Sequence, residues 1–342
     1  MLHFSHAIAR STLLPLLLLV SGLSGCAQTT LVRHWQPASI DVEGLDRVVI
    51  ADFDGENASA VTSVLDARLH SGRFYTLVDA AGLTPVQHAS FAPCRAESAI
   101  LKVAAEARVD AVISGSVVEY RCEDTILRQT DFDAHEGESD GEQPGHHFHV
   151  GFRQQDRVRR EGTVTIAFRM TDSRTGELRA AHTASHHYSG ESGPGEPALP
   201  PRGEVLEKLV GDCVEEFVQM TTPHEVEVPV RLAQPRLLQR HGGGVRSGNK
   251  LALQGKWDAA RDQWEAVIAE QPECDTALYN LAVDAARRRD YDAAEELAMQ
   301  ALQHKHNDRY VDGLEQIRQQ RASYDDARRQ RDQRSTQVAS SW

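Results

Sequence analysis

The feature that most constrains this chain is a short motif that occurs twice near its C-terminal end. Residues 255–260 read Gly-Lys-Trp-Asp-Ala-Ala, and residues 289–294 read Arg-Asp-Tyr-Asp-Ala-Ala, 34 positions further on. In each copy the small alanine side chains let two helices approach closely. An aromatic residue, Trp257 or Tyr291, fills the space beside the turn. The period therefore predicts two stacked helical hairpins.

The period and the motif resemble those of tetratricopeptide repeats. The resemblance implies an all-α domain over residues 248–330, in which 309–330 cap the stack. Such repeats bind partner peptides in a concave groove, and the matching groove positions here are Asn249, Tyr279, Asn280, Val283 and Arg287. The lysine and arginine that help the two asparagines hold a peptide carboxylate in some members are replaced by Val245 and Leu314. A carboxylate clamp and ordinary repeat packing therefore both remain open.

The N-terminus reads as a targeting signal. Arg10 precedes an apolar run that ends at Val20, too short for the roughly 20 residues of a membrane span. Leu-Ser-Gly-Cys at 23–26 follows and resembles the lipobox of bacterial lipoproteins. The resemblance implies that residues 1–25 are removed and that Cys26 carries covalent lipid, with no other cofactor expected. A plain secretory signal or an uncleaved anchor is the alternative.

The residue after that cysteine bears on location. Ala27 stands there rather than aspartate. By analogy with lipoproteins of Gram-negative bacteria, this favours anchoring in the outer membrane, with the body facing the periplasm. Residues 26–45 are then expected to be a tether.

Residues 46–222 alternate between strand and helix patterns and predict an α/β domain with a mixed sheet and flanking helices. We expect strands at 47–53, 74–79, 109–120, 162–171 and 178–188, and helices at 57–69, 97–107 and 204–220. Parallel pairing is expected early in this order and an antiparallel hairpin late. His182 and His186 share a face of the last strand, where we expect ordinary exposed positions.

The order of these elements, with Asp-x-x-Thr-Gly-Glu at 172–177 in the hairpin turn, resembles the CsgG/LpoB superfamily of outer-membrane lipoproteins. That superfamily includes the curli secretion channel and activators of peptidoglycan synthases. The resemblance covers residues 46–222, and an unrelated small α/β domain is the alternative.

Two stretches, 131–160 and 189–203, are expected to be loop insertions. Residues 131–149 contain six carboxylates and four imidazoles, so His146, His147 and His149 could ligate zinc or copper. A solvated, partly disordered loop is the preferred interpretation. The stretch lacks the alternating apolar residues of a membrane strand, so we expect no pore of the curli type.

Four cysteines follow Cys26, and an oxidising compartment would allow them to pair. Among three full pairings, Cys94 with Cys122 is favoured because they flank one helix–strand unit. No Cys-x-x-Cys occurs, so the sequence does not support a thiol oxidoreductase or a zinc ribbon.

Residues 223–247 are expected to link the domains, with an edge strand at 224–232, and the glycine-rich stretch 242–250 reads as a flexible joint. Residues 331–342 are expected to be a tail. From Arg318 onward, six arginines among several acids predict a solvated helix end that frays.

The formal charge of −13, from 37 basic and 50 acidic residues, argues against nucleic-acid binding. No catalytic constellation stands in a recognisable setting, so we expect no enzyme. The sequence favours a lipid-anchored periplasmic scaffold that binds envelope proteins or peptides during assembly or secretion. An activator of a peptidoglycan synthase is one alternative, and a metal-binding protein or metalloenzyme that uses the histidine-rich loop is another. The sequence does not predict an oligomeric state.

Overall fold

The computed structural model describes residues 29–80, 93–137, 147–236 and 239–340. In four stretches of these, 93–99, 131–137, 147–153 and 334–340, it describes the backbone only. Its described residues belong to two compact units. The α/β unit comprises Trp35–Glu225 and Ser323–Trp342, and the helical unit comprises Met1–His34 and Val226–Ala322. Each unit is described by itself.

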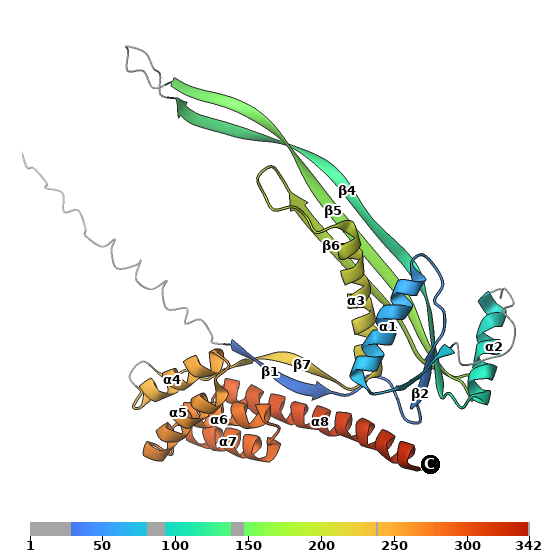
Figure 1. The fold of residues 1–342 in the computed structure, drawn as a ribbon. Coiled ribbons are helices and arrows are strands. Elements are labelled where there is room, and N and C mark those ends of the chain that lie inside the picture. The colour runs from blue at the N-terminus through green and yellow to red at the C-terminus, as the bar shows by residue number, and fades with distance from the viewer. Residues whose placement is uncertain (1–28, 81–92, 138–146, 237–238, 341–342) are drawn as a thin grey trace, which may run out of the picture. The chain divides into compact units, whose positions relative to one another are not determined.

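The α/β unit contains a five-stranded mixed sheet with the strand order β3-β2-β4-β5-β6 (Figure 1). The strands are β2 (Arg47–Ile50), β3 (Thr76–Val78), β4 (Ala111–Gly137), β5 (His147–Asp172) and β6 (Leu178–Ser192). β2 pairs in parallel with β3 and β4, while β4–β5 and β5–β6 are antiparallel. The expected mixed sheet, parallel early and antiparallel late, is therefore confirmed.

The helices of this unit cover both faces of the sheet. They are α1 (Ala58–Gly72), α2 (Pro93–Glu106) and α3 (Arg202–Thr221). Val48 belongs to the core that α1 and α3 cover, whereas the adjacent Val49 packs with Ala104 of α2. Successive strand side chains point to opposite faces, so α2 lies on the face opposite α1 and α3.

The main core of the α/β unit lies under α3, as the apolar stripe of that helix predicts. The ring of Phe217 on α3 stacks on Phe168 of β5 with their centroids 4.6 Å apart. Phe53 meets Phe168 edge-on at 5.6 Å. All three rings are buried and join the helix, the sheet and the segment after β2 into one core.

The prediction of a loop at 131–160 is wrong for the residues that the structure describes, because they belong to strands. β4 and β5 form one long hairpin that is paired from Ala111–Asp172 to Gly137–His147 (Figure 1). The hydrogen bonds between strands join main-chain groups, so pairing does not require an apolar side-chain pattern. Pairs of opposite charge across the two strands stabilise it further. Arg160 of β5, for example, hydrogen-bonds to Asp124 of β4, and together with Arg202 of α3 it holds the pKa of that carboxyl well below its usual range.

The second expected insertion is also shorter than predicted. β6 continues to Ser192, so the residues without regular structure begin after it rather than at 189. The expected tether is wrong in part as well, because Thr29–Gln36 is a strand, β1.

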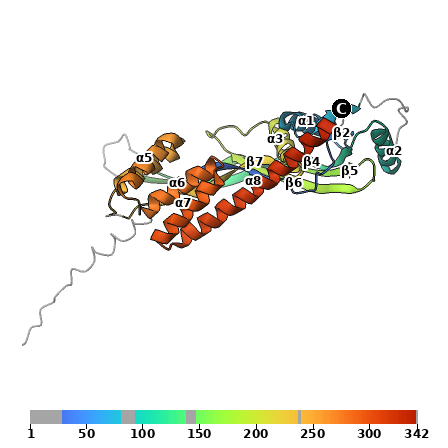
Figure 2. The ribbon, with the colours of Figure 1, turned by 90° about the horizontal axis from the view of Figure 1, so that it is seen from below.

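The strand expected near residue 224 is present and is β7 (His224–Arg231), which pairs with β1 in a two-stranded sheet. The helices that follow are α4 (Gly242–Leu253), α5 (Trp257–Glu270), α6 (Asp275–Arg287), α7 (Tyr291–His304) and α8 (Asp308–Ser340). Figure 2 shows α6, α7 and the first part of α8 lying side by side. Among the described residues, no helix combines the length and apolar character needed to span a membrane.

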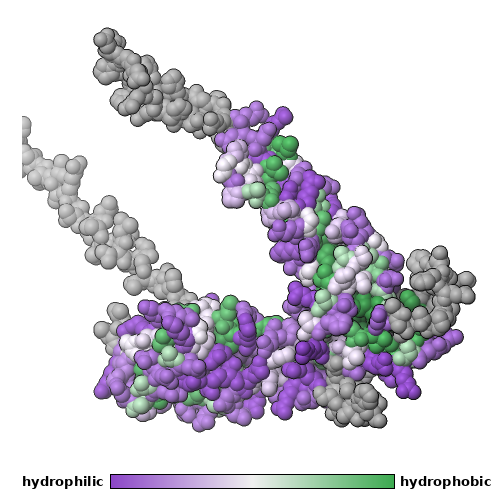
Figure 3. Space-filling view, in the orientation of Figure 1, coloured by the Kyte–Doolittle hydropathy of each residue, from purple (hydrophilic) through white to green (hydrophobic). Residues whose placement is uncertain are grey.

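The repeated motif falls at the same place in two helical hairpins. Trp257 begins α5 and Tyr291 begins α7, and the alanines three positions later, Ala260 and Ala294, are completely buried. The predicted helical domain is therefore confirmed as a C-terminal helical region with two equivalent hairpins. Figure 3 shows a largely hydrophilic surface on the visible face of these helices.

The glycine-rich stretch 242–250 was expected to be a flexible joint. That prediction is wrong, because the stretch forms most of α4. A Cβ at Gly248 would lie 2.3 Å from the indole nitrogen of Trp264, and one at Gly244 would lie 2.6 Å from a methyl of Val267. These glycines therefore let α5 pack closely against α4. Their number in a short stretch had predicted flexibility instead.

Candidate peptide-binding site

Two asparagines of the helical unit converge on a single residue of the chain. Asn249 lies on α4 and Asn280 on α6, and both are completely buried. Between them lies Ala233, which belongs to the segment after β7 and is 1% exposed. The structure thus brings together the two asparagines that the sequence placed in a peptide groove.

The two carboxamides satisfy both main-chain groups of Ala233. The Asn280 side-chain oxygen accepts a hydrogen bond from the Ala233 nitrogen at 2.7 Å. The Ala233 carbonyl accepts from the Asn280 amide at 3.1 Å and from the Asn249 amide at 2.9 Å. All three bonds go to main-chain atoms, so the two asparagines contact Ala233 through its backbone.

Hydrogen bonds among the groove residues themselves fix the orientation of these asparagines. The Asn249 oxygen accepts hydrogen bonds from the Asn280 amide at 2.7 Å and from the Trp264 indole at 3.2 Å. Trp264 is completely buried and reaches this position because Gly248 has no side chain. A satisfied buried network of this kind holds its members in one arrangement.

Apolar residues line the rest of the groove. Tyr279 and Val283 of α6, both buried, line a small pocket together with Val32 and Val230. The Tyr279 ring stacks on Tyr310 of α8 at 4.7 Å, and burial raises the pKa of the Tyr279 phenol. The two stacked rings add apolar surface beside this pocket.

Arg287, which the sequence also placed in the groove, has other partners. Its guanidinium donates to Asp284 at 2.9 Å and lies over the Trp257 ring at 5.0 Å. Arg287 therefore joins α6 to α5. Ala233 was not predicted as part of the site, since its only signal in the sequence is the apolar pattern of Val-x-Leu-Ala at 230–233.

The histidine-rich site lies largely outside the described residues. His146 is not described, and His147 and His149 belong to β5 without described side chains. Where side chains are described, no group of three or more histidines, cysteines or carboxylates could hold a metal ion. Metal binding by this stretch stays a prediction.

The lipidation site and the favoured disulfide are likewise untested. Cys26 lies outside the described residues, and Cys94 lies in α2 without a described side chain. Cys122 has a free thiol, partly buried beside Gly162 on the sheet face that α3 covers. A bond between Cys94 and Cys122 stays a prediction.

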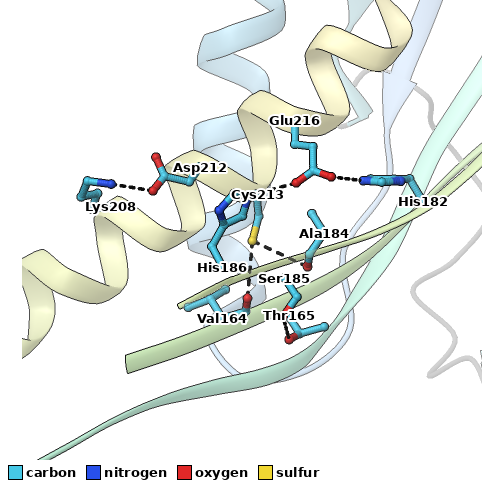
Figure 4. Close-up of polar contacts among 10 residues, drawn as sticks. All are labelled: Val164, Thr165, His182, Ala184, Ser185, His186, Lys208, Asp212, Cys213 and Glu216. Atoms are coloured by element: carbon cyan, nitrogen blue, oxygen red, sulfur yellow. Dashed lines mark hydrogen bonds and ion pairs between the residues drawn. The ribbon is translucent and has the colours of Figure 1, made fainter. Parts of the chain in front are cut away.

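A second polar cluster lies on the α/β unit, where two imidazoles meet one carboxylate (Figure 4). The ring nitrogens of His182 and His186 on β6 lie 2.7 Å and 2.9 Å from the two oxygens of Glu216 on α3. Both histidines do lie at partly exposed strand positions, with 29% and 35% of their side chains exposed, and both also contact a helix residue that was not predicted. Their spacing on one strand face was the available signal, but it did not reveal the helix residue between them.

The thiol beneath this cluster is a structural group. Cys213 donates weak hydrogen bonds to the carbonyls of Val164 and Ala184 at 3.6 Å and 3.7 Å. Burial raises the pKa of Cys213 to about 11, so the thiol stays protonated at neutral pH. A protonated, buried thiol is a poor nucleophile, so the cluster joins α3 to β6 rather than forming a cysteine–histidine pair.

The cluster predicts a pH-dependent contribution to stability. Partial burial opposes ionisation of Glu216, but hydrogen bonds from His182 and His186 hold its pKa below the usual range. A lowered pKa gives stability that is present above pH 4.3 or so and is lost as the pH falls through the folded-state value. Since the carboxylate is 44% exposed, Glu216→Gln should cost less than about 1 kcal/mol at pH 7.

Urea unfolding of both proteins between pH 7 and pH 3 measures this effect. The difference in unfolding free energy should shrink toward zero as the pH falls. Glu215→Gln, on the same helix but away from the imidazoles, controls for the loss of one negative charge. A difference that stays constant across this range would contradict the assigned role of Glu216.

Comparison with known proteins gives likeness only at the level of structure. No protein-family model matches the chain, and no curated protein matches it. Lipoprotein GNA1162 from Neisseria meningitidis is similar at 16% identity and a TM-score of 0.29, over 51% of this chain and 98% of that one. The PelC dodecamer from Paraburkholderia phytofirmans gives 16% and 0.26, over 54% and 94%.

A minor lipoprotein from Acinetobacter baumannii gives 10% identity and a TM-score of 0.23, over 51% of this chain and 91% of that one. Two of these three similar structures are thus bacterial lipoproteins by name. TM-scores this low support no conclusion about function. The function proposed below rests instead on the contacts of Asn249 and Asn280.

Proposed function

We propose that this chain is a non-catalytic, lipid-anchored scaffold of the bacterial envelope that binds peptide segments of other proteins through its helical unit. One observation carries the proposal: Asn249 and Asn280 together satisfy both main-chain hydrogen-bonding groups of Ala233. Contacts to the main chain are compatible with many sequences. A groove of this kind suits a scaffold that meets more than one protein.

Three features of the sequence support the same function. The second helices of the two hairpins begin at Trp257 and Tyr291, 34 positions apart, which is the period of tetratricopeptide-like repeats. The order of elements predicted for residues 46–222 resembles that of CsgG/LpoB-like lipoproteins. The lipobox-like residues before Cys26 supply a membrane anchor, which we assign to the outer membrane with the body in the periplasm.

The anchor is tested by Cys26→Ala. Acylation contributes about 0.8 kcal/mol per buried methylene, so its loss should move most of the protein from the membrane fraction to the soluble fraction. Cys122→Ser, which removes a thiol in the body of the protein, should leave the distribution unchanged. The anchor would be wrong if the Cys26 variant stayed with the membranes, or if mass spectrometry found no lipid on the mature protein.

Partner binding is tested by photo-crosslinking in intact cells. A crosslinker at Leu253 samples the surface of the helical unit and one at Val118 samples the α/β unit, because both side chains are exposed. We expect envelope proteins to be captured specifically from the helical unit. Failure to capture any such protein at either site would contradict the scaffold, as would substrate turnover by the purified chain.

A further inference from the structure

The groove proposed for partner peptides is filled by the chain itself. We propose that residues 230–235 are a built-in ligand of the helical unit, and that the groove accepts a partner peptide only after this segment leaves. The inference rests on the peptide-binding function proposed above and adds its regulation.

The filling segment is held mainly by side chains of the groove. β7 ends at Arg231, and residues 232–236 have no regular secondary structure. The main chain of Ala233 therefore takes its hydrogen bonds from Asn249 and Asn280 and not from a neighbouring strand. A bound peptide would be held in the same way, so another segment could replace this one at the cost of only the last two residues of β7.

The groove has an internal structure that does not require the segment. The bond from the Asn280 amide to Asn249, and the bond from the Trp264 indole to Asn249, join groove residues to one another. Both bonds can persist when Ala233 leaves. The asparagines would then keep the arrangement that binds a peptide, and their remaining polar groups could be hydrated.

The side chains of the segment define what a competing peptide must offer. Val230, Leu232 and Ala233 are 7%, 1% and 1% exposed, whereas Arg231 between them points to solvent and is exposed. The partner is therefore a peptide with the pattern apolar-any-apolar-small, in which the four positions correspond to residues 230–233. Charge at the intervening position is tolerated.

Both ends of the segment are held, which favours the closed state. Upstream, Val230 and Arg231 are the last two residues of β7, which pairs with β1. Downstream, Gln239 accepts from the Arg236 nitrogen at 2.9 Å and donates to Thr276 at the start of α6 at 2.9 Å. A tethered ligand acts at a local concentration on the order of millimolar, so a free peptide competes poorly until the segment is displaced.

The test opens the groove without altering it. Ala233→Pro removes the N–H that Asn280 accepts, and Leu232→Asp puts a carboxylate at an apolar contact. The probe is a fluorescent peptide with the sequence of residues 228–236, added to the full chain. We expect the double variant to bind one peptide per chain at least tenfold more tightly than the unaltered protein does.

Three controls accompany this titration. Arg231→Asp, at an exposed position, should leave the groove closed. A probe with proline at position 233 should not bind. Adding Asn280→Ala to the double variant should abolish binding. A double variant that keeps its helical circular dichroism and does not bind the probe would overturn the inference.

Hydrogen exchange of the unaltered protein tests the inference even if the double variant fails to fold. The Ala233 amide should exchange at least tenfold faster than the amide of Leu281 in the middle of α6, because the segment opens without unfolding the helix. Equal exchange would mean that the segment leaves only on unfolding, which would overturn the inference. Crosslinking in cells tests the proposed function separately, since both measurements here use the purified chain alone.

Discussion

Replacing Asp284 with alanine should destabilise the helical unit by about 3 kcal/mol. The Asp284 side chain is completely buried, and its two oxygens meet Arg287 at 2.9 Å, Arg288 at 3.1 Å and Arg261 at 3.3 Å. Removal of a buried carboxylate breaks all three ion pairs at once. The arginines are partly exposed and can turn to water, which places the cost at the lower end for a broken buried pair.

Two further variants separate charge from volume. Asp284→Asn keeps the shape of the side chain but loses its charge, and should cost less than the alanine variant. Asp292→Asn removes a carboxylate that is 86% exposed and pairs with Arg321, and should cost less than about 1 kcal/mol. Urea unfolding monitored by circular dichroism measures all three. Equal midpoints for Asp284→Ala and Asp292→Asn would show that the buried network contributes nothing.

The ion-pair network was not predicted, although part of it follows a sequence rule. Arg287 and Arg288 follow Asp284 by three and four positions, which is the spacing of neighbours on one helix face. Arg261 belongs to the preceding hairpin, and no spacing rule connects it to Asp284. The same division holds for the repeat, since Trp257 and Tyr291 marked where helices begin but not which residues they would meet.

The long hairpin shows where a sequence rule misled. Residues 111–120 and 162–171 have apolar side chains against a core and were predicted as strands. Beyond them the strands are charged, and strand prediction from apolar alternation has nothing to detect. Main-chain pairing continues there all the same, because opposite charges such as Arg160 and Asp124 face each other across the two strands.

The groove was predicted more completely than its occupant. Asn249 and Asn280 were placed in it because of their positions in the repeat, and the structure brings them together. The segment around Ala233 could not be assigned to the groove, because its contacts with α6 span 47 residues and depend on the stacking of both hairpins. Contacts between residues so distant in sequence leave no local pattern.

Asn280→Ala should have an effect as large as that of Asp284→Ala, about 3 kcal/mol. The change removes the bonds to the Ala233 nitrogen and carbonyl and the bond to Asn249. It also leaves the Ala233 N–H buried without a partner. The cost of an unpaired buried donor, added to a cavity in a closely packed site, exceeds the net value of the bonds themselves.

Asn249→Ala is the matched comparison, because it removes a carboxamide from the same network but leaves the Ala233 N–H paired with Asn280. It should therefore destabilise the helical unit by less than Asn280→Ala does, and should raise the exchange rate of the Ala233 amide by less. Urea unfolding and hydrogen exchange measure the two quantities. If the two variants were equal in both, the N–H bond would not be the dominant contact, and the segment would be held chiefly by the burial of Leu232 and its neighbours.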